Sequence, residues 1–174
     1  VLSLTAYQMR SDGVEVAVDL STDLPTLRGD FHQLQQVVLN ILNNAHHALR
    51  EHEGGRLVRV LTRRADGGAV LEVTDTGPGI EPEDLARIFD PFFTTKEVGK
   101  GTGLGLSIAA GIVASHSGRL EADSEPGSGA TFRMFLPSGS RAAEAEPRPE
   151  ERSARTRAPR AGGRILVVED EAPL

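Results

Sequence analysis

Cysteine and tryptophan are absent from this chain of 174 residues, which has only one tyrosine and six phenylalanines. Without cysteine there are no disulfides and no thiolate metal ligands, which is compatible with a reducing compartment. No stretch approaches the roughly 18 consecutive apolar residues of a membrane span, so we expect no membrane contact and a cytoplasmic location. The chain also lacks an initiator methionine and a signal peptide. It is therefore expected to be a piece of a longer protein, which is compatible with a membrane-anchored parent.

Positive charge is also scarce, because 19 lysines and arginines stand against 25 aspartates and glutamates. The formal net charge of −6 argues against a general nucleic-acid surface. An anionic ligand must therefore be held by local donors and not by the overall field of the protein. Hydrophobic residues make up 39% of the chain and are mostly aliphatic, which is enough to build the core of one ordinary domain.

Hydrophobic periodicity predicts alternating helices and strands up to residue 137. Helical spacing favours helices at 1–12, 31–52, 82–89 and 104–117. Alternating apolar residues favour strands at 14–20, 57–64, 70–75, 119–125 and 130–137. We expect Asp30 to cap the long helix, Gly54 to end it and Gly118 to end the last helix. The strand expected at 14–20 should be half-buried.

The character of the chain changes after Pro137. Residues 138–163 contain no large apolar side chain. They are expected to form a disordered linker, because they cannot bury enough surface to offset the entropy lost on ordering. A new hydrophobic strand then begins at 164–174.

The long helix carries two stripes when its residues are placed on a helical wheel. The core stripe consists of Leu34, Val38, Ile41, Ala45 and Leu49, and the polar stripe of Gln33, Gln36, Asn40, Asn44 and His47. Asn40 and Asn44 lie one turn apart and could present two amide oxygens to Mg²⁺, which would take its other ligands from water and nucleotide phosphates. An ordinary solvated face would have the same composition, so both interpretations stay open at this stage.

A first glycine-rich loop, DTGPGI, follows directly on a predicted strand. A buried carboxylate at Asp75 could accept a hydrogen bond from an exocyclic amine such as that of adenine. Gly77 and Gly79 would let the backbone approach a flat ring closely. The alternative is a tight turn with an aspartate cap.

A second glycine-rich loop, GKGTGLGLS, leads into the last helix. It does not fit the P-loop, because Thr94 stands where that motif needs its first glycine, and it does not fit the dinucleotide fingerprint either. Bare N–H groups at the start of a helix bind anions, and Lys96 and Lys100 add positive charge. We therefore predict a mobile phosphate-binding lid at 90–103, although a plain flexible loop would look similar.

Four motifs occur in order along the chain, and together they resemble the catalytic ATP-binding domain of sensor histidine kinases, in the GHKL (Bergerat-fold) superfamily. They are the N box QQVVLNILNNAHHAL, the first glycine box DTGPGI, the F box FDPFFTTK and the second glycine box GKGTGLGLSI. The resemblance covers about residues 14–137. It implies an α+β fold, a two-layer α/β sandwich in which a mixed five-stranded sheet lies against three main helices. ATP would sit between the long helix and the lid.

By matching positions, the resemblance also implies roles for individual residues. Asn40 and Asn44 would hold Mg²⁺, and with Lys96, a phosphate contact from the lid, they form the expected catalytic set. Asp75 would bond the adenine amine, and His47 stands where many members carry a phosphate-binding lysine. Further ATP contacts are implied for Gly77, Gly79, Ile80, Gly101, Thr102, Gly103, Leu104, Gly105, Leu106 and Thr131. Apolar anchoring of the lid is implied for Phe89, Phe92 and Phe93.

The residue at Asn40 separates branches of the superfamily. Hydrolysing relatives such as DNA gyrase, mismatch-repair and heat-shock chaperone ATPases carry glutamate there, as a general base for water. Asparagine cannot accept a proton at neutral pH. The resemblance therefore implies that the γ-phosphate is held for transfer to a histidine, with poor hydrolysis. Two alternatives remain, a GHKL-type serine kinase of the anti-sigma-factor kind and a non-catalytic nucleotide-binding interaction module.

The partners implied by the resemblance lie outside the ATP-binding domain. In the family, the phosphoacceptor histidine lies on an upstream dimerisation hairpin, and none of the five histidines here fits it. Residues 1–13 would then be the end of the connection from that hairpin, and the isolated chain should not autophosphorylate. The segment RILVVEDE resembles the first strand of a receiver domain, with Glu169 and Asp170 as its acidic pair. The expected partners are ATP, the dimerisation domain and a fused or separate receiver, but no nucleic acid.

Overall fold

The computed structural model describes residues 2–50, 52–95 and 101–139. Its elements are α1 (Leu2–Ser11), β1 (Glu15–Leu20), α2 (Phe31–Arg50), β2 (Leu57–Ala65), β3 (Gly68–Asp75), α3 (Pro82–Leu85), α4 (Gly105–Ser115), β4 (Arg119–Ser124) and β5 (Ala130–Pro137). Every helix and strand expected between residues 1 and 137 is present, although the helix expected at 82–89 is limited to residues 82–85. The linker expected at 138–163, except for its first two residues, and the strand expected at 164–174 lie outside the described residues.

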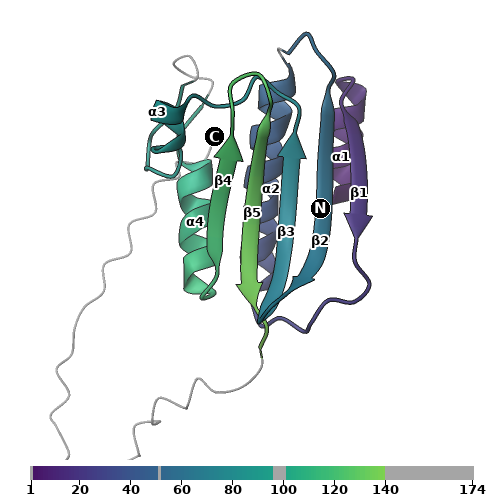
Figure 1. Ribbon diagram of the computed structural model, residues 1–174, viewed down its shortest axis with the longest axis vertical. Coiled ribbons are helices and arrows are strands. Elements are labelled where there is room, and N and C mark those ends of the chain that lie inside the picture. The colour runs from purple at the N-terminus through teal and green to yellow at the C-terminus, as the bar shows by residue number, and fades with distance from the viewer. Residues whose placement is uncertain (1, 51, 96–100, 140–174) are drawn as a thin grey trace, which may run out of the picture. The chain divides into compact units, whose positions relative to one another are not determined.

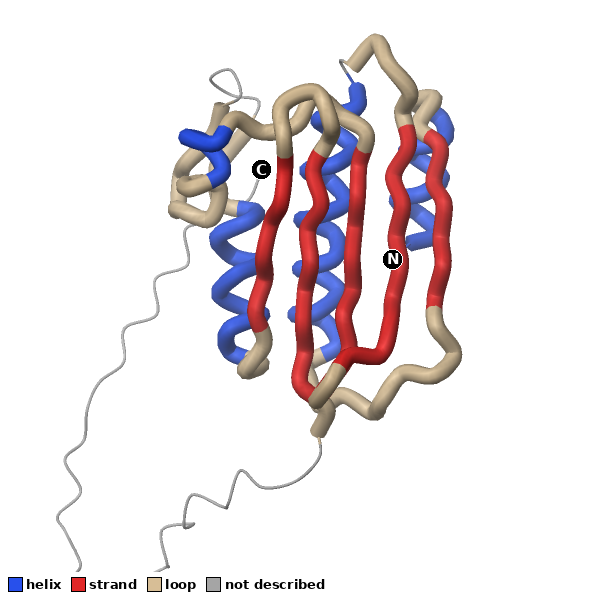
Figure 2. Tube along the Cα trace, viewed as in Figure 1, coloured by secondary structure: helices blue, strands red, loops and turns tan. Residues whose placement is uncertain are grey.

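The five strands form one sheet in the order β1-β2-β3-β5-β4. β1 pairs with β2 in parallel, and the other neighbours are antiparallel, so the sheet is mixed as expected. The helices α1, α2 and α4 lie on one side of the sheet (Figure 1), and the tube in Figure 2 shows the same two layers. This is the predicted two-layer α/β sandwich with three main helices. Within the described residues, no helix has the length and apolar character needed to cross a bilayer.

The hydrophobic core lies between the helices and the inward face of the sheet. Side chains alternate between the two faces of a strand, so Val60, Val73 and Phe132 point to the helices and are almost fully buried. On α2 the buried residues are Val37, Ile41, Leu42, Ala45 and Leu49. The expected stripe is thus wider than the sequence indicated, because α2 packs against α4 as well as against the sheet.

Helix α1 contributes directly to this core. Met9 is 1% exposed, and Val14, just after the turn that follows α1, is equally buried. The turn after α1 is joined to α2 by a hydrogen bond in which His46 Nε2 lies 2.9 Å from Asp12 Oδ2. Part of the segment expected to be a connection, residues 1–13, therefore packs into the domain itself.

The strand β1 is less buried than the alternation predicted. Val14 is buried and Val16 packs against the core, but Val18 and Leu20 are 47% and 49% exposed. The physical reason is that β1 is the edge strand, and the described helices shield only its beginning.

The ends of α2 and α4 follow the expected capping chemistry with one exception. Asp30 Oδ1 accepts hydrogen bonds from the N–H groups of His32 at 2.8 Å and Gln33 at 3.0 Å, as predicted. The bond from Gln33 is the main cause that lowers the pKa of the Asp30 carboxyl. At the end of α4, Ser117 and not Gly118 takes the left-handed conformation, with φ of 56°. Gly118 is needed for a different reason, because a side chain there would collide with the carbonyl of Phe135.

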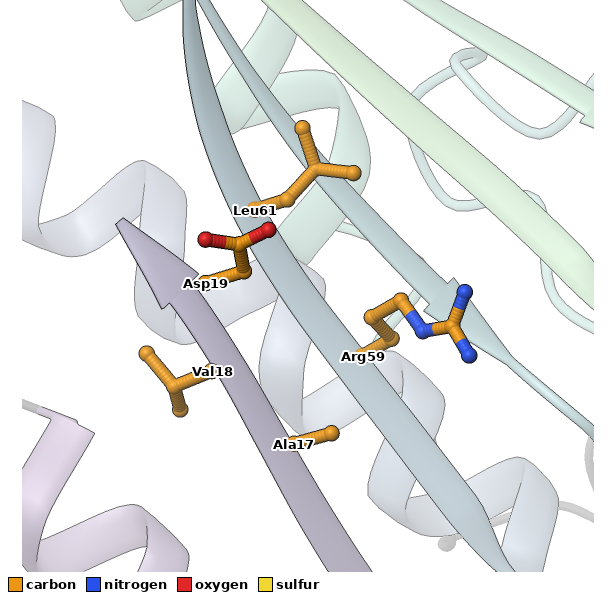
Figure 3. A pocket seen from close by; sticks show the side chains of 5 residues that line it. All are labelled: Ala17, Val18, Asp19, Arg59 and Leu61. Carbon is orange, nitrogen blue, oxygen red and sulfur yellow. The ribbon is translucent and has the colours of Figure 1, made fainter. Parts of the chain in front are cut away.

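The second face of the sheet carries polar side chains. Arg133 Nε donates to Glu72 Oε2 at 2.8 Å, and this bond is the main cause that raises the pKa of Arg133. A shallow hollow over β1 and β2 is lined by Ala17, Val18, Asp19, Arg59 and Leu61 (Figure 3). None of these residues belongs to the nucleotide site predicted from the sequence, which lies at the junction of α2, α4 and the end of β3.

Candidate functional site

The candidate site runs along α2. Asn40 Nδ2 donates to the carbonyl of Gly105 at 2.9 Å, which places Asn40 at the beginning of α4. Ala48, two turns further along α2, lies close to the loop after β3, because a Cβ at Gly77 would stand 3.2 Å from that of Ala48. At 1.5 Å per residue, the two points are about 12 Å apart along the helix axis. The loop after β3 and the start of α4 thus meet α2 at two points about two turns apart.

Both predicted asparagines have an amide oxygen to offer. A carbonyl can only accept, so the amide nitrogen of Asn40 must face Gly105, and no described residue is hydrogen-bonded to its Oδ1. No hydrogen bond from the described residues engages the amide of Asn44, which is half-buried one turn further along. Neutral amide oxygens are suitable ligands for Mg²⁺. The residues present therefore fit the predicted cation.

Asp75 is a buried residue, 3% exposed. Its Oδ1 accepts the N–H groups of Gly77 at 2.9 Å and Ala130 at 3.4 Å. Within the part of the chain that the structure describes, no hydrogen bond reaches Oδ2. This oxygen is the one left to accept a hydrogen bond from a ligand amine, as the sequence predicted.

Burial is the main cause that raises the pKa of Asp75 above its ordinary value of 3.8, while the two N–H bonds and the charge of His52 lower it. A carboxyl whose pKa is raised by folding supports stability below 3.8, and that support is lost as the pH rises through the folded pKa. We therefore expect Asp75→Asn, which cannot ionise, to have a higher free energy of unfolding than the parent at pH 7. The difference should shrink towards pH 4, as measured by chemical denaturation at several pH values. A pH-independent difference would contradict this account.

The first glycine box is fixed to the turn between β4 and β5. Ile80 N–H donates to Ser124 Oγ at 2.9 Å, and Ser124 Oγ donates to the carbonyl of Gly129 at 2.6 Å. Gly79 has φ of 76°, and a side chain there would collide with the carbonyl of Glu125. Glycine is therefore required at 79 for both conformation and close approach.

Gly79→Ala should lower the free energy of unfolding by about 2–4 kcal/mol, from a left-handed alanine and a backbone collision together. Gly67→Ala is the matched control, because Gly67 has φ of 73° with open space around its Cβ position. Gly67→Ala should lower the free energy of unfolding by only about 1–2 kcal/mol, the cost of the left-handed backbone conformation alone. Urea denaturation measures both, and equal losses would show that the contact with Glu125 carries no weight.

The start of α4 offers backbone donors. Its N-cap residue Leu104 makes no side-chain capping bond, and the first N–H groups of a helix have no partner within the helix. Gly103 has φ of 64°, and its carbonyl accepts the N–H of Phe92 at 3.0 Å. Thr102 Oγ1 accepts from Leu104 N–H at a long 3.4 Å. The N–H groups of Gly105 and Leu106, in the first turn of α4, thus have no partner within the helix and lie beside Asn40.

The structure does not bring every predicted residue to the site. Thr131 points to the opposite face of β5 from Ala130, and its hydroxyl lies 3.1 Å from that of Thr74. An adenine contact by Thr131 remains a prediction that this geometry does not favour, because the next residue, Phe132, is the one turned inward. His47 Nδ1 donates a hydrogen bond to the carbonyl of Asn43 at 2.6 Å. The neutral ring therefore carries its one proton on Nδ1 and has none on Nε2 to donate to a phosphate.

The predicted lid is only partly described. Lys96 and Lys100 lie outside the described residues. Phe89 and Phe93 pack against the core, as expected of lid anchors, but Phe92 is 74% exposed. The anchoring role of Phe92 is therefore wrong in this structure, because its pairing with Gly103 turns its side chain outward.

Sequence reasoning missed three residues that build the site, Ser124, Gly129 and Ala130. Gly129 has φ of 81°, and a side chain there would collide with the carbonyl of Asp75. The sequence signal was the PGSG turn before the last strand, which was assigned only to the hairpin.

Comparison with known proteins identifies the family and the fold of the chain. Residues 29–140 match the family model described as histidine kinase-, DNA gyrase B- and HSP90-like ATPase. Sensor kinase CckA of Brucella abortus (strain 2308) is 40% identical over 91% of the chain and 18% of its own length. Two-component sensor PprA of Pseudomonas aeruginosa (strain PAO1) is 44% identical over 78% of the chain and 15% of its own length. The chain thus spans less than a fifth of these two curated relatives.

Two solved structures show the same fold. The mycobacterial sensor histidine kinase MprB is 32% identical with a TM-score of 0.64, over 78% of this chain and 91% of that one. Full-length ShkA in complex with AMPPNP is 33% identical with a TM-score of 0.66, over 78% of this chain and 28% of that one.

Proposed function

Because the chain belongs to the histidine kinase-, DNA gyrase B- and HSP90-like ATPase family, we propose that it binds Mg²⁺-ATP and presents the γ-phosphate to a histidine outside this chain. The observation that carries this proposal is the hydrogen bond from Asn40 Nδ2 to the carbonyl of Gly105. It sets a neutral amide, which cannot serve as a general base, beside the uncapped donors of α4. A site of this kind holds a triphosphate without activating water against it.

We propose that the residues along α2 bind the two ends of the nucleotide separately. Asp75 Oδ2 would accept the exocyclic amine of adenine, while Ile80 and the glycines at 77 and 79 line the ring. The N–H groups from 101 to 106 would donate to the phosphates, with Lys96 as an additional cationic contact. Asn40 and Asn44 would hold Mg²⁺, which when bound neutralises phosphate charge and orients the γ-phosphate.

The proposed acceptor is a histidine on a dimerisation domain that precedes this segment in the parent protein. We propose the start of a receiver at 164–174 from the segment RILVVEDE and its acidic pair Glu169 and Asp170. We propose a cytoplasmic location because ATP, the proposed substrate, is found there. The relatives named above are sensor kinases, and no observation favours the serine kinase or the non-catalytic module over them.

The proposal is tested by incubating the isolated chain and the full-length parent with ATP labelled at the γ-phosphate. We expect acid-labile phosphate on the parent and none on the isolated chain, because the chain lacks the acceptor. Labelling of the isolated chain, or acid-stable phosphate on serine in the parent, would contradict the proposal.

A further inference from the structure

Helix α4 is attached to α2 at both of its ends. At its beginning, the carbonyl of Gly105 accepts from Asn40 Nδ2 at 2.9 Å. Just beyond its end, His116 Nε2 accepts the backbone N–H of Asp30 at 3.0 Å. Asp30 is the residue that caps α2, so the second attachment joins the end of α4 to the beginning of α2. The two helices therefore run side by side with one hydrogen bond at each end.

The hydrogen bonds of His116 specify a single tautomer. Nε2 accepts an amide proton and must carry none of its own, so the proton of the neutral ring is on Nδ1. Nδ1 lies 2.8 Å from the carbonyl of Ile112, to which it can donate. Both ring nitrogens are thus hydrogen-bonded, Nδ1 to a residue of α4 and Nε2 to the residue that caps α2.

The surroundings are shaped to admit this ring. A Cβ at Gly29 would stand 2.9 Å from His116 Cδ2 and 2.8 Å from Leu34 Cδ1, so a larger residue there would force the imidazole or the leucine to shift. Helix α4 itself contains no charged residue, and the carboxylate of Asp30 is engaged with the N–H groups of His32 and Gln33. The imidazole is therefore the polar group that holds this end of α4.

We propose that His116 is a positioning residue for the nucleotide site, acting through the register and tilt of α4 against α2. This inference rests on the proposed function. Helix α4 is about 16 Å long, and it carries the phosphate donors at the end opposite to His116. Release of the far end leaves the helix held by Asn40 and by packing, so the donors at 103–106 lose their fixed direction relative to Asn40 and Asn44. Displacements of about 1 Å are enough to weaken a preorganised site.

Two substitutions at His116 separate hydrogen bonding from packing. His116→Gln places an amide oxygen near the position of Nε2 and keeps the acceptor for Asp30 N–H. His116→Asn is shorter, reproduces only the Nδ1 side, and loses that acceptor. His46→Asn is a control on α2, because His46 bonds Asp12 after α1 and takes no part in the two hydrogen bonds that join α2 to α4.

Calorimetry with Mg²⁺-ATP should show that His116→Asn raises the Kd about five- to tenfold, the usual value of one oriented hydrogen bond. The Kd of His116→Gln and of His46→Asn should stay within about twofold of that of the unsubstituted chain, since each variant keeps the hydrogen bond to Asp30 N–H. Amide exchange of Asp30 should be slow in the parent and in His116→Gln, and fast in His116→Asn. Nitrogen-15 NMR of the parent should find His116 protonated at Nδ1.

The possible results separate the inference from the proposed function. If the unsubstituted chain binds Mg²⁺-ATP and His116→Asn binds it equally well, His116 does not position the site and the proposed function stands. A ring protonated at Nε2 in the neutral parent would overturn the inference in the same way. If the unsubstituted chain itself does not bind Mg²⁺-ATP, the proposed function fails, and the inference fails with it.

Discussion

Asn44→Ala is expected to abolish the Mg²⁺-dependent part of ATP binding and to leave the fold intact. Asn44 is half-buried on the same face of α2 as Asn40, and no described residue engages its amide, so the fold does not depend on that group. Its removal takes one oxygen ligand from the proposed Mg²⁺ site. We expect the Kd for Mg²⁺-ATP to rise about 100-fold, the upper end of the loss seen when a single group supporting a metal is removed.

Asn43→Ala is the matched control for this experiment. Asn43 precedes Asn44 on α2, but its side chain is exposed. The same atoms are removed from the same turn of the helix, so any change in helix stability is shared by the two variants. Titration calorimetry with and without Mg²⁺ measures the effect, and an Asn44→Ala protein that keeps the parent's Mg²⁺ dependence would remove Asn44 from the site.

Asp75→Asn is expected to lower the affinity for ATP about 100-fold while preserving the loop around it, because a donor left unpaired in a buried site is costly. The amide oxygen of asparagine can still accept from the N–H groups of Gly77 and Ala130. The other position changes from an acceptor to an NH₂ donor, which then faces the NH₂ donor of adenine. The same substitution should improve binding of inosine triphosphate, whose ring carries a carbonyl oxygen in place of that amine.

The ratio of the two affinities distinguishes recognition from general damage. A loop that had merely loosened would lose both nucleotides to a similar extent. Asp19→Asn is a suitable control, because Asp19 lies on the open face of β1 (Figure 3), outside the site, and makes the same change in charge. An Asp75→Asn protein that still prefers ATP over inosine triphosphate as strongly as the parent would show that Asp75 does not read the base.

The sequence predicted the elements of the fold well because their signals are local. The 3.6-residue stripe of Ile41, Ala45 and Leu49 and the alternation of β5 can be read without knowledge of neighbouring elements. The exposure of Val18 and Leu20 could not be predicted in this way, since it depends on which strand is the edge of the sheet and how far α1 reaches over it.

The candidate site was predicted in outline and corrected in detail. Asp75 and Asn40 were recognised by their place in motifs, and the structure gives both the surroundings expected of them. The bond from Asn40 to Gly105 joins residues 65 positions apart, and the direction of Thr131 depends on the register of β5 against β3. Neither is encoded in a short stretch of sequence, because each arises only when distant elements pack together.

The most direct test of the account is a calorimetric titration of the chain with ATP, performed with Mg²⁺ and again with a chelator in its place. The account predicts one site per chain, with affinity that falls at least tenfold when the cation is withheld, since Asn40 and Asn44 act on the nucleotide through it. Absence of binding in the presence of Mg²⁺, or equal binding without it, would contradict the central claim that the junction of α2 and α4 holds a magnesium triphosphate.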